Sequence, residues 1–251
     1  MKFRFSAAVL GAILLPLALV VGAGEPVDEA TMKKLRAALE VPQNGLKIQS
    51  AQNSELPGLI EVQFERGPLV YASADGRFFV VGDLYTTDPA GYDNLTEKKR
   101  DAQRREQLAG VKQSDMIVFA AEGETRAHVT VFTDVTCFYC QKLHKEVPEL
   151  NKRGVEVRYL AYPRAGVDSP GFKQLASAWC ADNPQDTLTR LKNKQQVPEN
   201  VCKGNPIASQ YALGQEMGVR GTPAIITESG EMIPGYQAAD ALMMTLGLDL
   251  R

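Results

Sequence analysis

The stretch TDVTCFYCQKLH, residues 133–144, is the most informative part of this chain. Two residues separate Cys137 from Cys140, and the alternating run HVTVF just before them is typical of a strand. The residues after Cys137 have the spacing of an amphipathic helix, so the pair lies where a strand gives way to a helix. Cysteines at this spacing can bind a metal, close a small ring, or exchange electrons with another disulfide.

A metal site and a purely structural ring are the less favoured alternatives. A structural zinc site needs four Cys or His ligands, but the chain has two histidines, His128 and His144, and no second CxxC. Cys180 and Cys202 lie far apart in a segment with a helical pattern. A disulfide within the CxxC would close so small a ring that it would remove little chain entropy. We therefore expect no metal and no cofactor.

The redox alternative fits the position of the pair. A thiolate at the start of a helix is stabilised by unpaired N–H groups and by the helix dipole. The sequence therefore predicts an exposed, nucleophilic Cys137 and a more buried Cys140 that resolves mixed disulfides. Phe138 and Tyr139, between them, have apolar bulk that could contact a substrate. We expect His144 to lie, with Lys142, on the exposed face of the same helix.

A second motif, VRGTPAI (219–225), places Thr222 and Pro223 just before a predicted strand. Proline lacks the N–H that a strand ladder uses, so its place here needs another reason. A cis peptide would turn the chain sharply and leave neighbouring backbone groups free. We expect those groups to pair with an extended substrate beside Cys137.

The first residues read as a targeting segment. Lys2 and Arg4 precede the apolar run SAAVLGAILLPLALVVGA, which ends near Ala23. We interpret residues 1–23 as a secretory signal peptide. The alternative, a membrane anchor, is disfavoured because the run is short, contains Pro16 and lacks a basic cluster after it. The mature chain is then expected in the periplasm, where disulfides persist.

Composition narrows the classes of function. The 251 residues are 44% hydrophobic with a net charge of −2, so no basic face for nucleic acid is expected. The charged run KKRDAQRRE (98–106) reads as a solvated helix face. The four cysteines allow several pairings but are too few to replace a hydrophobic core.

Residues 24–88 are expected to form a small α+β domain. A helix begins after Asp28 and ends before Pro42. Turn signals separate three predicted strands: LIEVQF (59–64), PLVYAS (68–73) and RFFVVGDLY (77–85). A unit of this size is marginal alone and often gains stability by pairing.

A polar break and a linker follow. TTDPAGYDNLT (86–96) is expected to lack regular structure. The charged segment 97–110 predicts a stiff helix, so residues 89–112 are assigned as a linker. Strands are then predicted at 116–121, 128–135 and 155–163, a helical segment at about 165–218, a hairpin at 224–227 and 231–236, and a last helix.

The motifs together resemble a known family. VTVFTDVTCFYCQKLH, VRYLAYPRAG, AWCA, YALGQEMGVRGTPA and PGYQ are similar to segments of the bacterial periplasmic disulfide isomerases of the DsbC/DsbG type. The resemblance implies a cystatin-like dimerisation domain (24–88), a linker helix (89–112) and a thioredoxin-like catalytic domain (113–251) with a helical insertion. It also implies a V-shaped homodimer.

The resemblance also implies roles for residues. Cys137 and Cys140 would be the redox pair and Pro223 the cis-proline. Cys180 and Cys202 would form a structural disulfide, with a second redox pair or zinc ligands as alternatives. The sequence departs from the family between the catalytic cysteines, where Phe-Tyr replaces Gly-Tyr or Pro-Tyr. The redox potential and the substrate preference therefore stay open.

The implied function is a disulfide isomerase with a chaperone-like role. Its partners would be unfolded or misoxidised exported proteins and a membrane thiol reductant similar to DsbD. One alternative is a reductase that rescues single oxidised cysteines, sulfenic acids included. Another is a chaperone or binding protein whose CxxC is incidental. A monomeric oxidase of the DsbA kind is disfavoured because it would not need residues 25–110.

Overall fold

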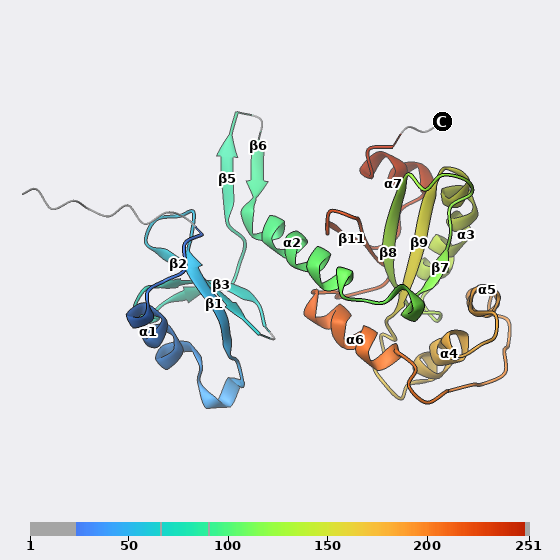
Figure 1. Cartoon of the computed structure of the whole chain (residues 1–251), viewed down its shortest axis with the longest axis horizontal. Coiled ribbons are helices and arrows are strands. Elements are labelled where there is room, and N and C mark those ends of the chain that lie inside the picture. The colour runs from blue at the N-terminus through green and yellow to red at the C-terminus, as the bar shows by residue number, and fades with distance from the viewer. Residues whose placement is uncertain (1–23, 66, 90, 249–251) are drawn as a thin grey trace, which may run out of the picture. The chain divides into compact units, whose positions relative to one another are not determined.

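The computed structural model describes residues 24–65, 67–89 and 91–248 (Figure 1). The predicted signal peptide, residues 1–23, lies outside the described residues. The chain divides into two compact units, one ending at Gly82 and the other beginning at Asp83. No helix within the described part of the chain combines the length and apolarity needed to cross a membrane.

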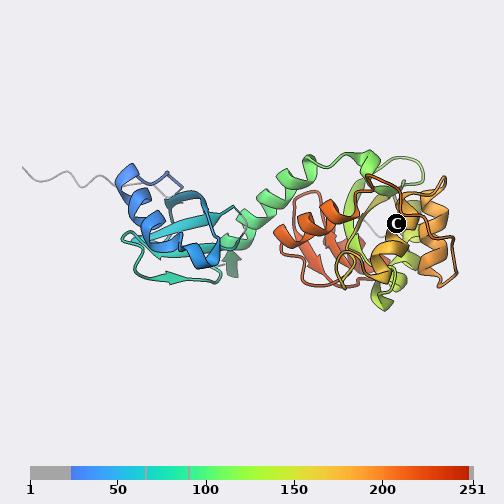
Figure 2. The same cartoon turned by 90° about the horizontal axis from the view of Figure 1, so that it is seen from below.

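The first unit is a helix packed on a four-stranded antiparallel sheet (Figure 2). Its elements are α1 (Glu29–Leu39), the short helix η1 (Pro42–Asn44), β1 (Ile48–Asn53), β2 (Leu59–Phe64), β3 (Leu69–Ser73) and β4 (Phe79–Val80). Asp28 caps α1 by accepting a hydrogen bond from the Thr31 N–H at 2.6 Å. Leu35 and Leu39 face the sheet and are buried. The predicted helix and its capping residue are confirmed.

Two expectations for residues 77–96 are wrong. Only Phe79 and Val80 of the predicted strand RFFVVGDLY pair with β3. The predicted polar break instead forms a hairpin of β5 (Tyr85–Asp88) and β6 (Gly91–Asn94). The hairpin turns at Gly91, whose φ of 143° favours glycine, and Asp88 accepts a hydrogen bond from the Gly91 N–H.

The second unit is built on a five-stranded mixed sheet in the order β11-β10-β8-β9-β7, in which only β8 and β9 are parallel. The strands are β7 (Ile117–Phe119), β8 (Ala127–Thr133), β9 (Val155–Ala161), β10 (Ala224–Ile226) and β11 (Met232–Pro234). The helices are α2 (Leu95–Ala109), η2 (Gln113–Asp115), α3 (Phe138–Lys152), α4 (Pro170–Trp179), α5 (Pro184–Lys192), α6 (Ile207–Glu216) and α7 (Ala239–Thr245). The segment from α4 to α6 lies between β9 and β10 in the chain and is the helical insertion (Figure 1).

Each face of this sheet has its own core. Successive residues of β8 point to opposite faces, so Val129 and Val131 join the core that includes α3 and α7. Phe132 joins the other core, which contains residues of α6 and the chain after α2. Burial on both faces holds β8 rigidly, and β8 leads directly to the CxxC.

Helix α2 is fixed to the second unit. Arg104, at its centre, is 5% exposed and donates hydrogen bonds to the carbonyls of Met217 and Gly230 at 3.2 and 3.3 Å. It also binds the carboxylates of Glu97 and Asp101. The prediction of a solvated face is therefore wrong for Arg104, because these acceptors satisfy its buried guanidinium.

Candidate functional site

The turn between β8 and α3 positions Cys137. Cys137 is the N-cap of α3, and its N–H donates to the Asp134 carbonyl at 3.2 Å. The Asp134 carboxylate accepts hydrogen bonds from the N–H and the hydroxyl of Thr136 and from Arg164. Although burial raises the pKa of Asp134, these bonds, led by that of the Arg164 N–H, lower it overall, so a buried carboxylate fixes the turn.

Cys137 meets a loop that is distant in sequence. Its thiol donates to the Thr222 carbonyl at 3.2 Å, and the Thr222–Pro223 peptide is cis. The Pro223 carbonyl accepts a hydrogen bond from the Gly235 N–H, so this carbonyl is not free for a substrate. Cys137 is only 4% exposed, and the expectation of an exposed sulfur is wrong because the Thr222 loop covers it. The structure brings Cys137, Cys140, Thr222 and Pro223 together.

The two thiols differ in acidity. The pKa of Cys137 is lowered to about 5, chiefly by the Cys140 thiol, against the effect of burial. The Cys140 N–H and the charge of Arg164 lower it further. Burial, followed by the Cys137 thiol, raises the pKa of Cys140 above its usual range. At neutral pH Cys137 is therefore the thiolate and Cys140 the thiol, the order that the helix start predicts.

Phe138 and Tyr139, between the two buried cysteines in the chain, lie at the surface. They are 65% and 56% exposed, and their rings meet edge to face at 5.4 Å. Large exposed aromatic side chains beside a reactive group are suited to contacting a partner chain. Lys142, also exposed, lies over the ring of Tyr236 at 4.2 Å.

A buried polar cluster beneath the pair was missed from sequence. His144 is 7% exposed, so its predicted exposure is wrong, and its ring nitrogens bind the hydroxyls of Tyr159 and Thr189 at 3.1 and 2.9 Å. Burial, and then the charge of Lys192, lowers the pKa of His144 to about 3. Lys192 is itself 2% exposed. One sequence signal for it exists, because Lys192 follows Leu188 by four residues on an apolar helix stripe.

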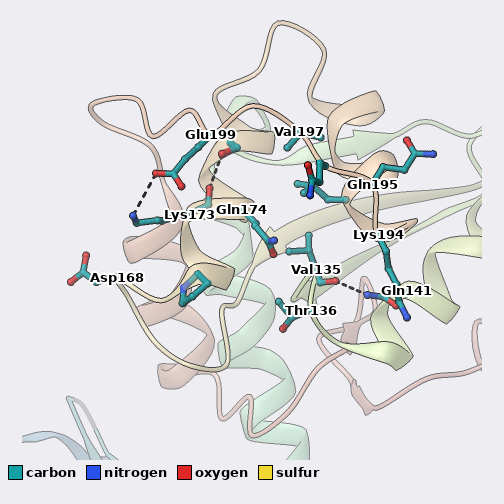
Figure 3. A pocket seen from close by; sticks show the side chains of 14 residues that line it. Val135, Thr136, Gln141, Asp168, Lys173, Gln174, Lys194, Gln195, Val197 and Glu199 are labelled. Carbon is teal, nitrogen blue, oxygen red and sulfur yellow. Dashed lines mark hydrogen bonds and ion pairs between the residues drawn. The ribbon is translucent and has the colours of Figure 1, made fainter.

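A pocket of about 780 Å³ adjoins the CxxC turn (Figure 3). Val135, Thr136 and Gln141 line it on the side of the turn, and residues of the insertion line the other side. Figure 3 shows Gln141 reaching back to the Val135 carbonyl, at 2.8 Å, and Lys173 paired with Glu199. Thr136, the residue that precedes Cys137, is therefore part of the pocket wall.

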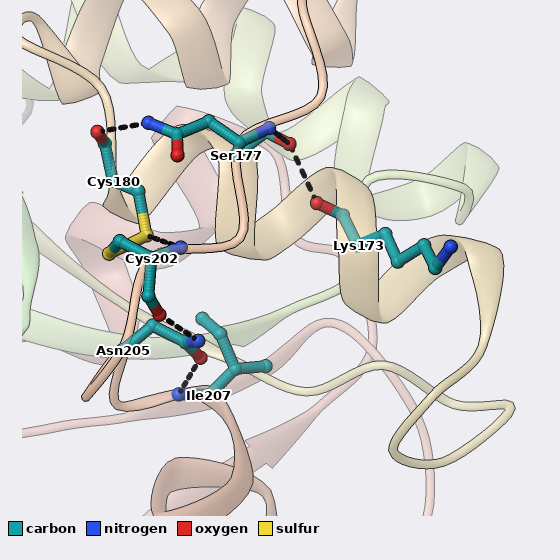
Figure 4. Close-up of a disulfide and its surroundings, with 7 residues drawn as sticks. Lys173, Ser177, Cys180, Cys202, Asn205 and Ile207 are labelled. Atoms are coloured by element: carbon teal, nitrogen blue, oxygen red, sulfur yellow. Dashed lines mark hydrogen bonds between the residues drawn. A yellow bond between two sulfur atoms is a disulfide. The ribbon is translucent and has the colours of Figure 1, made fainter.

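A disulfide joins Cys180, at the end of α4, to Cys202, in the segment before α6 (Figure 4). The two sulfurs are 2.07 Å apart, and Asn200 donates a hydrogen bond to the Cys180 carbonyl. The bond ties together the ends of the segment that contains α5. In the part of the chain that the structure describes, no three His, Cys, Asp or Glu side chains are grouped to hold a metal ion.

Comparison with known proteins agrees with this geometry. A family model described as a thioredoxin-like domain matches residues 112–247, and one described as the N-terminal domain of disulfide bond isomerase proteins matches residues 23–97. The chain is 35% identical to the thiol:disulfide interchange protein DsbC of Salmonella typhimurium, over 94% of this chain and 92% of that one. It is 34% identical to DsbC of Haemophilus influenzae, over 92% and 95%.

A thioredoxin-like sheet with a CxxC at the start of a helix, beside a cis-proline loop, defines a thiol-disulfide oxidoreductase. Within this class, the match of residues 23–97 to the isomerase N-terminal domain and the 35% identity along the chain point to one family. The chain belongs to the DsbC family of thiol:disulfide interchange proteins.

Proposed function

We propose that this chain is a protein disulfide isomerase that shuffles incorrect disulfides in exported proteins. The observation that carries the proposal is the contrast between the acidic thiol of Cys137 and the buried thiol of Cys140. The Cys137 thiolate attacks a substrate disulfide, forming a mixed disulfide and releasing one substrate sulfur as a thiolate. Another substrate thiolate then attacks the mixed disulfide and frees Cys137, with no net oxidation.

Cys140 supplies a second way to resolve the mixed disulfide. Its sulfur attacks that of Cys137, so the substrate leaves reduced and the enzyme keeps a Cys137–Cys140 disulfide. Two electrons must then return the pair to the dithiol. We assign that step to a membrane thiol reductant of the DsbD kind. Stabilisation of the Cys137 thiolate favours the reduced pair, which is the form that isomerisation uses.

Substrate binding is assigned to the surface around Cys137. Phe138 and Tyr139 offer exposed aromatic area, and Thr222 and Pro223 form the loop that faces the sulfur. A chain bonded to Cys137 could continue into the pocket that begins at Thr136. Binding of apolar segments of unfolded chains would also provide chaperone activity.

Dimerisation is assigned to residues 24–88. In the first unit, β4 is an edge strand of the sheet. Four residues at this edge are exposed by 56–67%: Phe78, Phe79, Val80 and Val81. An exposed apolar edge strand invites pairing with another chain, and a second copy of this domain is the partner that we propose. Residues 113–251 would form the catalytic domain.

The periplasm is the proposed location. The predicted signal peptide, the Cys180–Cys202 disulfide and the similarity to DsbC proteins support it. Structural disulfides persist in oxidising compartments and are rare in the cytosol.

Refolding of a scrambled protein with several disulfides tests the proposal. The wild type should restore activity to the scrambled substrate, and Cys137→Ser should abolish this because the thiolate that attacks the substrate is lost and Cys140 is buried and held protonated. Cys140→Ser should retain part of it, since isomerisation needs only the first sulfur, and is the matched control. Unchanged refolding by Cys137→Ser would remove the isomerase assignment. Reduction of sulfenic acids without refolding would favour the reductase, and suppression of aggregation alone would favour the chaperone.

A further inference from the structure

Lys192 is a buried cation directly beneath the reactive turn. Its ammonium donates to the Thr133 hydroxyl at 2.5 Å and to the Asp134 carbonyl at 3.2 Å. The same Asp134 carbonyl accepts the N–H of Cys137 at 3.2 Å. A single backbone oxygen therefore connects the lysine to the first residue of the CxxC.

No carboxylate pairs with this ammonium within the described residues. The carboxylate of Asp134, the residue whose carbonyl the ammonium contacts, is engaged by Thr136 and Arg164 instead. Burial of an unpaired ammonium is costly, and it lowers the pKa of Lys192 to about 8. An apolar residue of similar length would remove this cost, so stability alone does not explain the lysine.

The groups that face Lys192 are mostly acids or neutral rings. Cys137 and Cys140 approach from α3, and the ring of Tyr159 lies 5.8 Å from the ammonium on β9. The imidazole of His144 is held neutral by burial and by Lys192. The positive charge of Lys192 favours the Cys140 thiolate, although burial of Cys140 acts more strongly in the opposite direction.

We propose that Lys192 is a positioning residue for the release step, in which its ammonium stabilises the Cys140 thiolate while that sulfur attacks the mixed disulfide. In the reduced pair, Cys137 carries the negative charge. Once Cys137 is bonded to substrate it is neutral, and the charge must form on buried Cys140. The Cys140 proton passes to water, the Cys137–Cys140 bond forms, and the substrate sulfur leaves with the electron pair and takes up a proton.

The inference rests on the proposed roles of Cys137 and Cys140, and one assay separates the two claims. The reduced protein is mixed with an excess of 5,5′-dithiobis(2-nitrobenzoate), which releases a coloured thiolate at each step. The first phase reports the attack by Cys137, and the second reports the release by Cys140. Both rates are measured against pH for the wild type, Lys192→Met and Lys203→Met. Lys203 is exposed, lies in the same insertion and does not line the pocket beside the CxxC turn, so its variant is the matched control.

Lys192→Met should slow the second phase at pH 7 by about tenfold or more and move its pH dependence to higher pH. The first phase should change by less than about threefold, and Lys203→Met should match the wild type in both phases. Lys192→Arg, which keeps the charge, should recover part of the second-phase rate. If Lys192→Met fails to fold by circular dichroism, Lys192→Gln replaces it.

The inference is overturned if the second phase of Lys192→Met, or of Lys192→Gln where it replaces it, keeps the wild-type rate and pH dependence. The proposed function would then stay intact. A wild type without a first phase would instead overturn the proposed function. Loss of both phases together in a folded Lys192→Met protein would also overturn the inference, because the lysine would then not act on release specifically.

Discussion

Cys137 owes its acidity to its neighbours. Its sulfur is almost fully covered, and burial alone would raise its pKa. The Cys140 thiol offsets this effect and contributes more than the guanidinium of Arg164. The reactive form therefore depends on a partner that is itself held protonated by burial.

Replacing Cys140 should raise the pKa of the Cys137 thiol. In the wild type, alkylation of Cys137 should rise as the pH passes about 5 and level off above it, because the thiolate is the reacting form. Cys140→Ala should move this midpoint to higher pH, so alkylation at pH 6 slows. Iodoacetamide kinetics against pH measure both variants, with Lys142→Ala as an exposed control that should keep the wild-type midpoint. An unchanged midpoint in Cys140→Ala would contradict the assigned cause.

His144 should make the fold sensitive to acid. Its pKa is about 3 in the folded protein and near 6.5 in an unfolded chain, so the unfolded state binds more protons between these values. Stability should thus fall as the pH drops from 6.5 towards 3, by on the order of 2–4 kcal/mol in the free energy of unfolding. In the oxidised protein, His144→Gln should flatten this slope in urea titrations. His128→Gln should flatten it less, because His128 is partly exposed and paired with Glu228.

Local patterns predicted the reactive residues, but not the groups beneath them. Cys137 and Cys140 could be found from spacing, and Thr222–Pro223 from its place before a strand. The hydrogen bond and the low pKa of His144 depend on Thr189 and Lys192, which α5 brings from far along the chain. Such contacts are a property of tertiary packing, so helix periodicity around His144 could not reveal them.

At the scale of elements, α2 lies very close to the turn between β10 and β11. A Cβ on Gly230 would lie 1.9 Å from the Asp101 carbonyl oxygen, and the Gly230 φ is 92°. Together with Arg104, this approach holds α2 against the second unit. The sequence predicted α2 but not its attachment, because one buried arginine within a charged run has no distinct pattern.

Gly230→Ala should push α2 away from the turn between β10 and β11. The variant should lose about 2–4 kcal/mol in the free energy of unfolding, from backbone strain and from overlap with Asp101. Gly235→Ala is the matched control, since its φ of 84° is similar and nothing lies within 4 Å of the added Cβ. It should lose about 1–2 kcal/mol from strain alone. Equal losses in urea titrations would show that the α2 contact contributes nothing.

At the scale of the whole molecule, each of the two units in the described part of the chain has its own buried core residues: one cluster in the first unit, and one on each face of the sheet in the second. The first unit packs α1 on its own sheet, and the second surrounds the mixed sheet on both faces. The sequence predicted both units from their periodicity and turn signals. The short β4 and the β5–β6 hairpin were missed because apolar runs and polar turns do not report which strands pair.

The proposed dimer makes a prediction for the first unit. Phe79→Lys should weaken self-association by at least about tenfold in Kd, because a charge would be buried at the paired edge. Multi-angle light scattering over a dilution series measures it. Met244→Lys is the control, since Met244 is 61% exposed but lies on α7 in the second unit. A wild type that stays monomeric, or equal effects of both variants, would count against the assignment of the edge.

The near-complete burial of Cys140, at 1% exposure, limits how other proteins can use the pair. That sulfur is also held protonated, whereas Cys137 is the thiolate, so exchange with any outside donor or acceptor of electrons has to pass through Cys137. Oxidising and reducing partners would then compete for one atom. Their relative rates of arrival, rather than separate docking sites for each cysteine, would set how much of the pool stays active.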